Sequence, residues 1–129
     1  MDIRDLQSWV DSYERAWRTP GTEGLAQLFH EEAVYVPPPL AEPVVGLEAI
    51  RRFWEDERSP DEEFTMISEP IAFEGDTGVV RVDVQYHRPE ARRFAELWIV
   101  SFGPDGRCRR FEEEFWDDVE AGLAGADLP

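Results

Sequence analysis

FAELWIVSFGPDGRCRRFEEEFWD, residues 94–117, is the stretch that decides the fold. Two runs rich in aromatic and β-branched residues flank a turn cluster at residues 103–106, which predicts a pair of antiparallel strands. Pairing Phe102 with Arg107 places Glu96 directly opposite Glu113, because residues of an antiparallel ladder pair in strict order. Alternation along the strands then puts six side chains on one face of the hairpin: Phe94, Glu96, Trp98, Phe111, Glu113 and Phe115.

Two glutamates facing each other among aromatic rings are unusual, since like charges across a ladder repel. If Glu96 and Glu113 face an apolar pocket, desolvation and repulsion should leave one of them protonated near neutral pH. One can then act as the acid and the other as the base in a proton transfer. The alternative is that an arginine such as Arg81 or Arg52 pairs with them and the carboxylates only hold the sheet together.

Hydrophobic periodicity predicts three helices, one short strand, and then four consecutive antiparallel strands. Asp2 is expected to cap the first helix, which ends before Pro20. The expected helices cover residues 2–18, 25–29 and 47–58, and the expected strands cover residues 33–36, 64–73, 79–87 and the two arms of the hairpin. This order predicts an α+β domain with helices on one face of a strongly curved, mainly antiparallel sheet. Residues 1–120 are expected to form one domain and 121–129 a frayed tail.

The composition of the chain argues against several kinds of binding partner, metal site and cofactor site. The net charge is −16 and the isoelectric point is near 4.3, which argues against nucleic acid and anionic membranes as partners. With Cys108 as the single cysteine and no signal-like start, a cytoplasmic protein is expected. Two histidines, His30 and His87, are too few for a multi-histidine metal site. The sequence has no phosphate-binding glycine loop and no nucleophile elbow, so no cofactor is expected.

The register of the strand at 79–87 decides which of its residues join the glutamates. If Arg88 pairs with Arg93, four polar residues of this strand lie on the same face of the sheet as Glu96 and Glu113: Arg81, Asp83, Gln85 and His87. The other face is then aliphatic: Val80, Val82, Val84, Tyr86, Ala95, Leu97 and Ile99. An uncovered aliphatic face of this size predicts a homodimer through the outer face of the sheet. The alternative is that the aliphatic face is the core, and a one-residue slip in register would exchange the faces.

Several other residues are candidates for a chemical role, and each also has a purely structural interpretation. Asp83 and His87 can form an acid/base couple, although a histidine beside a turn is more often solvated surface. Tyr13 can donate to a developing oxyanion, although a helical aromatic stripe is more often core packing. Tyr35 and the three prolines that follow it can frame the pocket mouth or form a rigid strand edge. The aromatic residues expected to bind a ligand are Trp17, Tyr35, Trp54, Phe94, Trp98, Phe111 and Phe115.

Four segments in this order resemble the NTF2-like superfamily, in particular SnoaL-like proteins and ketosteroid isomerases. The segments are YERAW at 13–17, GLAQLFHEEAVY at 24–35, GLEAIRRFW at 46–54 and GRCRRFEEEFWD at 106–117. The resemblance covers nearly the whole chain. It implies a cone in which a curved sheet wraps the helices and leaves a pocket, on which isomerases, cyclases, hydrolases and non-catalytic binding proteins are all built.

The resemblance implies a mixed set of functional residues. Tyr13 falls at the tyrosine of the ketosteroid isomerase oxyanion hole, whereas Pro37 and Trp98 fall where that family has its two acidic residues. In SnoaL-type cyclases an aspartate near the end of the closing strand acts as acid and base, and Asp117 is similar. Their partner histidine corresponds loosely to His87. The expected function is cofactor-independent acid/base chemistry on an apolar substrate. The alternatives are a hydrophobic-ligand-binding protein and a structural dimer module.

Overall fold

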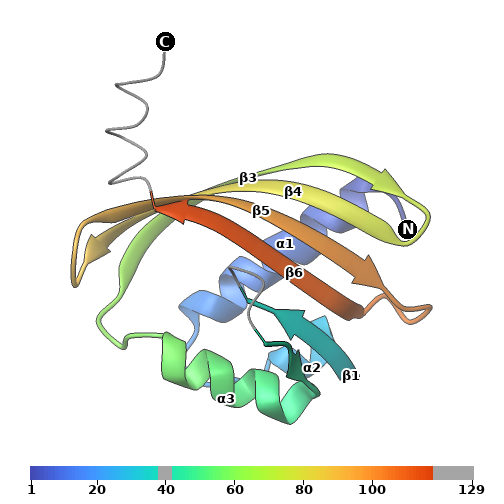
Figure 1. Ribbon diagram of the computed structural model, residues 1–129, viewed down its shortest axis with the longest axis horizontal. Coiled ribbons are helices and arrows are strands. Elements are labelled where there is room, and N and C mark those ends of the chain that lie inside the picture. The colour runs from blue at the N-terminus through green and yellow to red at the C-terminus, as the bar shows by residue number, and fades with distance from the viewer. Residues whose placement is uncertain (38–41, 118–129) are drawn as a thin grey trace.

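The computed structural model describes residues 1–37 and 42–117, and the tail expected at 121–129 lies outside them. Three helices and six strands follow one another along the chain (Figure 1). They are α1 (Ile3–Arg18), α2 (Leu25–Leu28), β1 (Phe29–Val36), β2 (Val44–Val45), α3 (Leu47–Glu57), β3 (Glu63–Glu74), β4 (Thr77–Arg88), β5 (Arg92–Phe102) and β6 (Cys108–Asp117). The predicted α+β class is confirmed, with β2 as an additional short strand.

The sheet is mixed and has the order β2-β1-β6-β5-β4-β3. Strands β3 to β6 form an antiparallel meander, and β1 joins its edge parallel to β6. Figure 1 shows the long strands curving over α1, with α2 and α3 on the same concave side. Pro70 lies on β3, the edge strand, where the ladder shifts register between Pro70 and Ala72, as expected for a proline within a strand.

The first helix begins where the sequence predicts. The Asp2 side chain accepts hydrogen bonds from the backbone N–H groups of Arg4 and Asp5, at 2.8 and 3.1 Å. Asp5 accepts from the Asp2 backbone N–H at 2.7 Å, which completes a capping box. At the other end, the Arg58 guanidinium donates to four backbone carbonyls in and after the last turn of α1. This arginine therefore ties the end of α3 to the end of α1.

The predicted register of β4 against β5 is wrong. Val84 pairs with Phe94 and Tyr86 with Arg92, so the connection between paired residues covers 87–91 rather than 89–92. The register differs by an odd number of residues, and β4 therefore presents its opposite face. Val80, Val82 and Val84 face the helices and belong to the buried core. The outer face carries Arg81, Asp83 and Gln85 beside Ala95, Leu97 and Ile99, and is mixed rather than aliphatic.

Candidate functional site

A cavity of about 460 Å³ lies between the concave face of the sheet and the helices. Helices α1 and α3 contribute Tyr13, Trp17, Phe53 and Glu57 to its lining. The strands contribute Tyr35, Phe64, Met66, Val84, Tyr86, Phe94, Glu96, Trp98, Glu113 and Phe115, and Pro37 follows β1. Two larger depressions, of about 850 and 950 Å³, share the loop at residues 19–23 and contain neither Glu96 nor Glu113. The aromatic cavity on the concave side of the sheet is therefore the one that contains the carboxylate pair.

The two glutamates are diagonal neighbours and not a directly opposed pair as predicted. Trp98 pairs with Glu113, and Glu96 pairs with Phe115. The register shifts between Ser101 and Phe102, and the pairing ends two residues away from the one expected. A shift of two residues leaves every side chain on its predicted face, so both carboxylates still point into the cavity.

Ring donors hold the two carboxylates in place. The Trp98 indole N–H donates to Glu96 Oε1 at 2.8 Å, and the Tyr35 hydroxyl donates to Glu113 Oε1 at 2.8 Å. Burial, the negative charge of Glu113, and a hydrogen bond to Glu113 together raise the pKa of Glu96 to about 10. The donation from Trp98 acts in the opposite direction. Glu96 therefore keeps its proton at neutral pH.

Two tyrosines stand beside this pair with their phenol protons retained. Burial first, and then the charge of Glu113, raise the pKa of the Tyr13 and Tyr35 hydroxyls well above the ordinary value. Both rings stack on Phe111, with centroid distances of 5.4 and 5.0 Å. Tyr13 is thus held rigidly in the cavity wall, where a phenol can donate to a bound oxygen atom.

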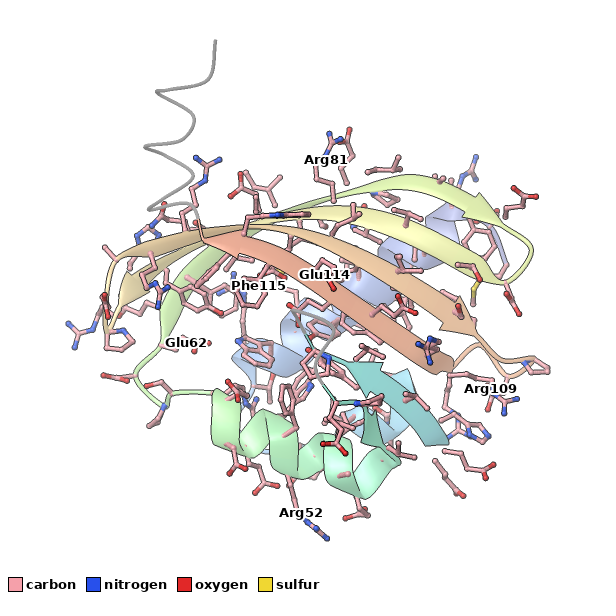
Figure 2. The ribbon with its side chains drawn as sticks, viewed as in Figure 1. Arg52, Glu62, Arg81, Arg109, Glu114 and Phe115 are labelled. Carbon is pink, nitrogen blue, oxygen red and sulfur yellow. The ribbon has the colours of Figure 1, made fainter. Side chains whose placement is uncertain are left out.

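Neither of the arginines suggested by the sequence compensates the carboxylates. Arg81 pairs with Glu69 at 3.4 Å, and Figure 2 shows it on the convex side of the sheet. Arg52 is exposed and points away from the sheet on the far side of α3 (Figure 2). Among the ion pairs of the described residues, none includes Glu96 or Glu113. The carboxylate pair is therefore not a structural salt bridge within the part of the chain that the structure describes.

A family model for the SnoaL-like domain matches residues 10–112, which is most of the chain. The chain belongs to the SnoaL-like family. Comparison with curated proteins finds no match. Among solved structures, an LEH-like epoxide hydrolase of M. tuberculosis superimposes with a TM-score of 0.73 at 13% identity, covering 95% of this chain and 92% of that chain.

Two further structures of this kind extend the comparison. An NTF-2 like protein of unknown function from Burkholderia xenovorans LB400 has a TM-score of 0.71 at 14% identity, covering 91% and 87% of the two chains. A ketosteroid isomerase-like protein from Erwinia carotovora atroseptica SCRI1043 has a TM-score of 0.63 at 13% identity, covering 88% and 95%. At these identities the likeness concerns the fold, and it confirms the NTF2-like architecture.

Of the other candidates from the sequence, Asp83 and His87 lie outside the cavity. Asp83 is on the outer face and forms an ion pair with Arg93 at 2.6 Å. His87 is exposed near the end of β4. The odd register shift of β4 turned both away from the cavity. Asp117 ends β6, and its side chain lies outside what the structure describes.

The predicted aromatic residues separate into a lining set and a supporting set. Five of them line the cavity: Trp17, Tyr35, Phe94, Trp98 and Phe115. Trp54 and Phe111 are fully buried and contact the lining from behind. Residues that the sequence analysis missed include Phe64, Val84 and Tyr86. The alternation of Val80, Val82, Val84 and Tyr86 signals a covered face and could have identified the last two.

The described residues include no group of three or more His, Cys, Asp or Glu side chains arranged to hold a metal ion. None of the helices within those residues is long and apolar enough to cross a bilayer.

Proposed function

We propose that this SnoaL-like protein performs acid/base chemistry of the isomerase, cyclase or hydrolase type on a small, largely apolar molecule. Glu96, which carries the proton, acts as the acid, and Glu113 acts as the base. The observation that carries the proposal is the position of the two carboxylates: they come from adjacent strands and meet in an aromatic cavity without an arginine partner among the described residues.

The environments of the two carboxylates suit opposite roles. Glu96 is kept neutral by burial, so it can give a proton to a developing oxygen anion. Glu113 accepts a hydrogen bond from the Tyr35 hydroxyl, which orients its carboxylate to remove a proton from carbon or from a water molecule. Tyr13 supplies a further neutral O–H donor in the same wall. Together the three residues offer an acid, a base and a further hydrogen-bond donor around one cavity.

The test is proton exchange at carbon in deuterated water, with a panel of cyclic ketones, enones and epoxides followed by NMR. Replacing Glu96 or Glu113 by glutamine should lower the rate on a responding compound by roughly 10²- to 10⁴-fold. Glu114→Gln is the matched control, because Glu114 follows Glu113 on β6 but pairs with Leu97 on the outer face. Equal rates in all variants would contradict the proposal.

A binding protein without chemistry is the second candidate, and one observation favours it. Both carboxylates already accept a hydrogen bond from a neighbouring ring, which holds them in place without a substrate. In that case both glutamine variants should keep the ligand affinity of the wild-type protein and none should show turnover. A purely structural module would have a filled interior, and the cavity of about 460 Å³ counts against it.

We also propose that a second copy of the chain covers the outer face of the sheet. Ile67 and Trp116 are 74% and 55% exposed there, beside the half-buried Leu97 and Ile99. Sedimentation equilibrium should give a dimer for the wild-type protein and a monomer for Leu97→Arg. A monomer for the wild-type protein at micromolar concentration would contradict this assembly.

A further inference from the structure

The ionisable groups that line the cavity are acids and phenols. The carboxylates are Glu57, Glu96 and Glu113, and the phenols are Tyr13, Tyr35 and Tyr86. Among the described lining residues there is no arginine or histidine. The Glu113 charge is therefore met by one phenol donor and the proton of its neighbour, which leaves it short of positive charge.

The walls of the cavity suit a cation as well. Phe94 lies edge-on to Phe115, with centroids 5.0 Å apart and planes at 88°. It lies edge-on to Tyr86 as well, at 5.8 Å and 84°. Rings set at right angles around a space present both faces and edges to it, and aromatic faces attract ammonium groups. The lining thus combines several aromatic rings with carboxylates.

Rings of this wall already hold cations on the protein's own side chains. The Arg18 guanidinium carbon lies 3.9 Å from the centroid of Phe64, and that of Arg92 lies 5.1 Å from the centroid of Phe94. Arg18 does not line the cavity and is held by Glu14 and by the Phe64 carbonyl. It therefore does not supply the missing positive charge inside.

The net charge of the protein also favours a cationic ligand, at longer range. The chain carries a net charge of −16, and Glu57 stands exposed where α3 meets the cavity. Such a field concentrates cations at the protein surface and repels anions. An anionic ligand would also lie against Glu113 without a compensating positive group, and like charges in contact repel.

We propose that the ligand of this cavity is a hydrophobic amine: an apolar body carrying a positively charged nitrogen. The nitrogen lies against Glu96 and Glu113, and the body packs against Tyr86, Phe94 and Phe115. This inference rests on the proposed function only in taking this cavity as the ligand site. It adds the charge of the ligand, which the acid/base mechanism alone leaves open.

The test uses three probes that share a phenyl ring and a tetrahedral head and differ in charge. They are phenyltrimethylammonium, tert-butylbenzene and benzenesulfonate, each titrated into the full chain and followed by the indole N–H signals in ¹H–¹⁵N NMR spectra. Trp17 and Trp98 line the cavity and report on it directly. The cation should bind at least roughly tenfold more tightly than its neutral isostere, and the anion most weakly.

Substitutions test whether Glu113 is the source of the preference for the cationic probe. Glu113→Gln should abolish the preference for the cation and leave the affinity for tert-butylbenzene unchanged, whereas Glu114→Gln should change neither.

Two results would overturn the inference, and they bear differently on the proposed function. If tert-butylbenzene or benzenesulfonate binds at least as tightly as the cation, the ligand class is wrong and the acid/base proposal stands. If none of the probes shifts the Trp98 signal, the inference fails together with the role of the cavity as a ligand site.

Discussion

Replacing Glu96 by glutamine tests the protonated carboxyl through the pH dependence of stability. The pKa of Glu96 is raised to about 10 in the folded protein, against an ordinary value of 4.5. Between these values the folded chain holds a proton that the unfolded chain has released. The free energy of unfolding therefore receives its full contribution from this group below about pH 4.5, and loses it progressively as the pH rises toward 10.

One proton corresponds to about 1.4 kcal/mol per pH unit, or at most about 3 kcal/mol between pH 6 and 8. Wild-type protein should lose this much stability relative to Glu96→Gln over that interval, as measured by urea denaturation at both ends. Contributions from the two histidines cancel in the difference between the proteins. Glu114→Gln should follow the wild-type slope. Identical slopes for wild type and Glu96→Gln would refute the shared proton.

Three more substitutions probe the frame around the site. Tyr35→Phe removes the donor to Glu113 and should cost about 1 kcal/mol of unfolding free energy, as well as lowering any turnover, which denaturation and exchange assays can measure. Arg58→Met should cost about 2 kcal/mol by calorimetry because four carbonyls at the end of α1 lose their donor, whereas the exposed Arg52→Met should stay within about 0.5 kcal/mol. Gly78→Ala should destabilise by about 1–3 kcal/mol, because the added methyl carbon would lie 2.5 Å from a buried leucine of α1. A neutral effect of Arg58→Met or Gly78→Ala would show that the loop or the helix relaxes freely.

The sequence predicted most reliably the face of the sheet on which a side chain lies, because alternation along a strand alone determines it. Alternation in β5 and β6 places Glu96 and Glu113 on the same face of the sheet. A register shift by an even number of residues does not change that face, and in the structure both side chains line the cavity. Pairing within the hairpin was less accessible, because Phe102 pairs with Cys108 rather than with Arg107 and the ladder shifts by one more residue between Phe102 and Ser101. Alternation is a local property of a strand, whereas register depends on the geometry of the connection.

In β4 the predicted register was wrong by an odd number of residues, which exchanged the two faces of the strand. The connection at residues 87–91 is one residue longer than expected and the ladder is offset by three, so Asp83 and His87 moved to the outer face and Tyr86 to the cavity. The aliphatic alternation of β4 contained the correct answer, since only one face of the sheet is covered by helices. Considering burial before pairing would have favoured that register.

The proton between Glu96 and Glu113 is the central claim, and NMR of the side-chain carboxyl carbons of ¹³C-labelled glutamate measures it most directly. One glutamate signal should remain that of a neutral carboxyl at pH 7 and should disappear in Glu96→Gln. If every glutamate signal instead titrates near the ordinary pKa and none is neutral at pH 7, the carboxylates are both ionised and the account of this cavity is contradicted.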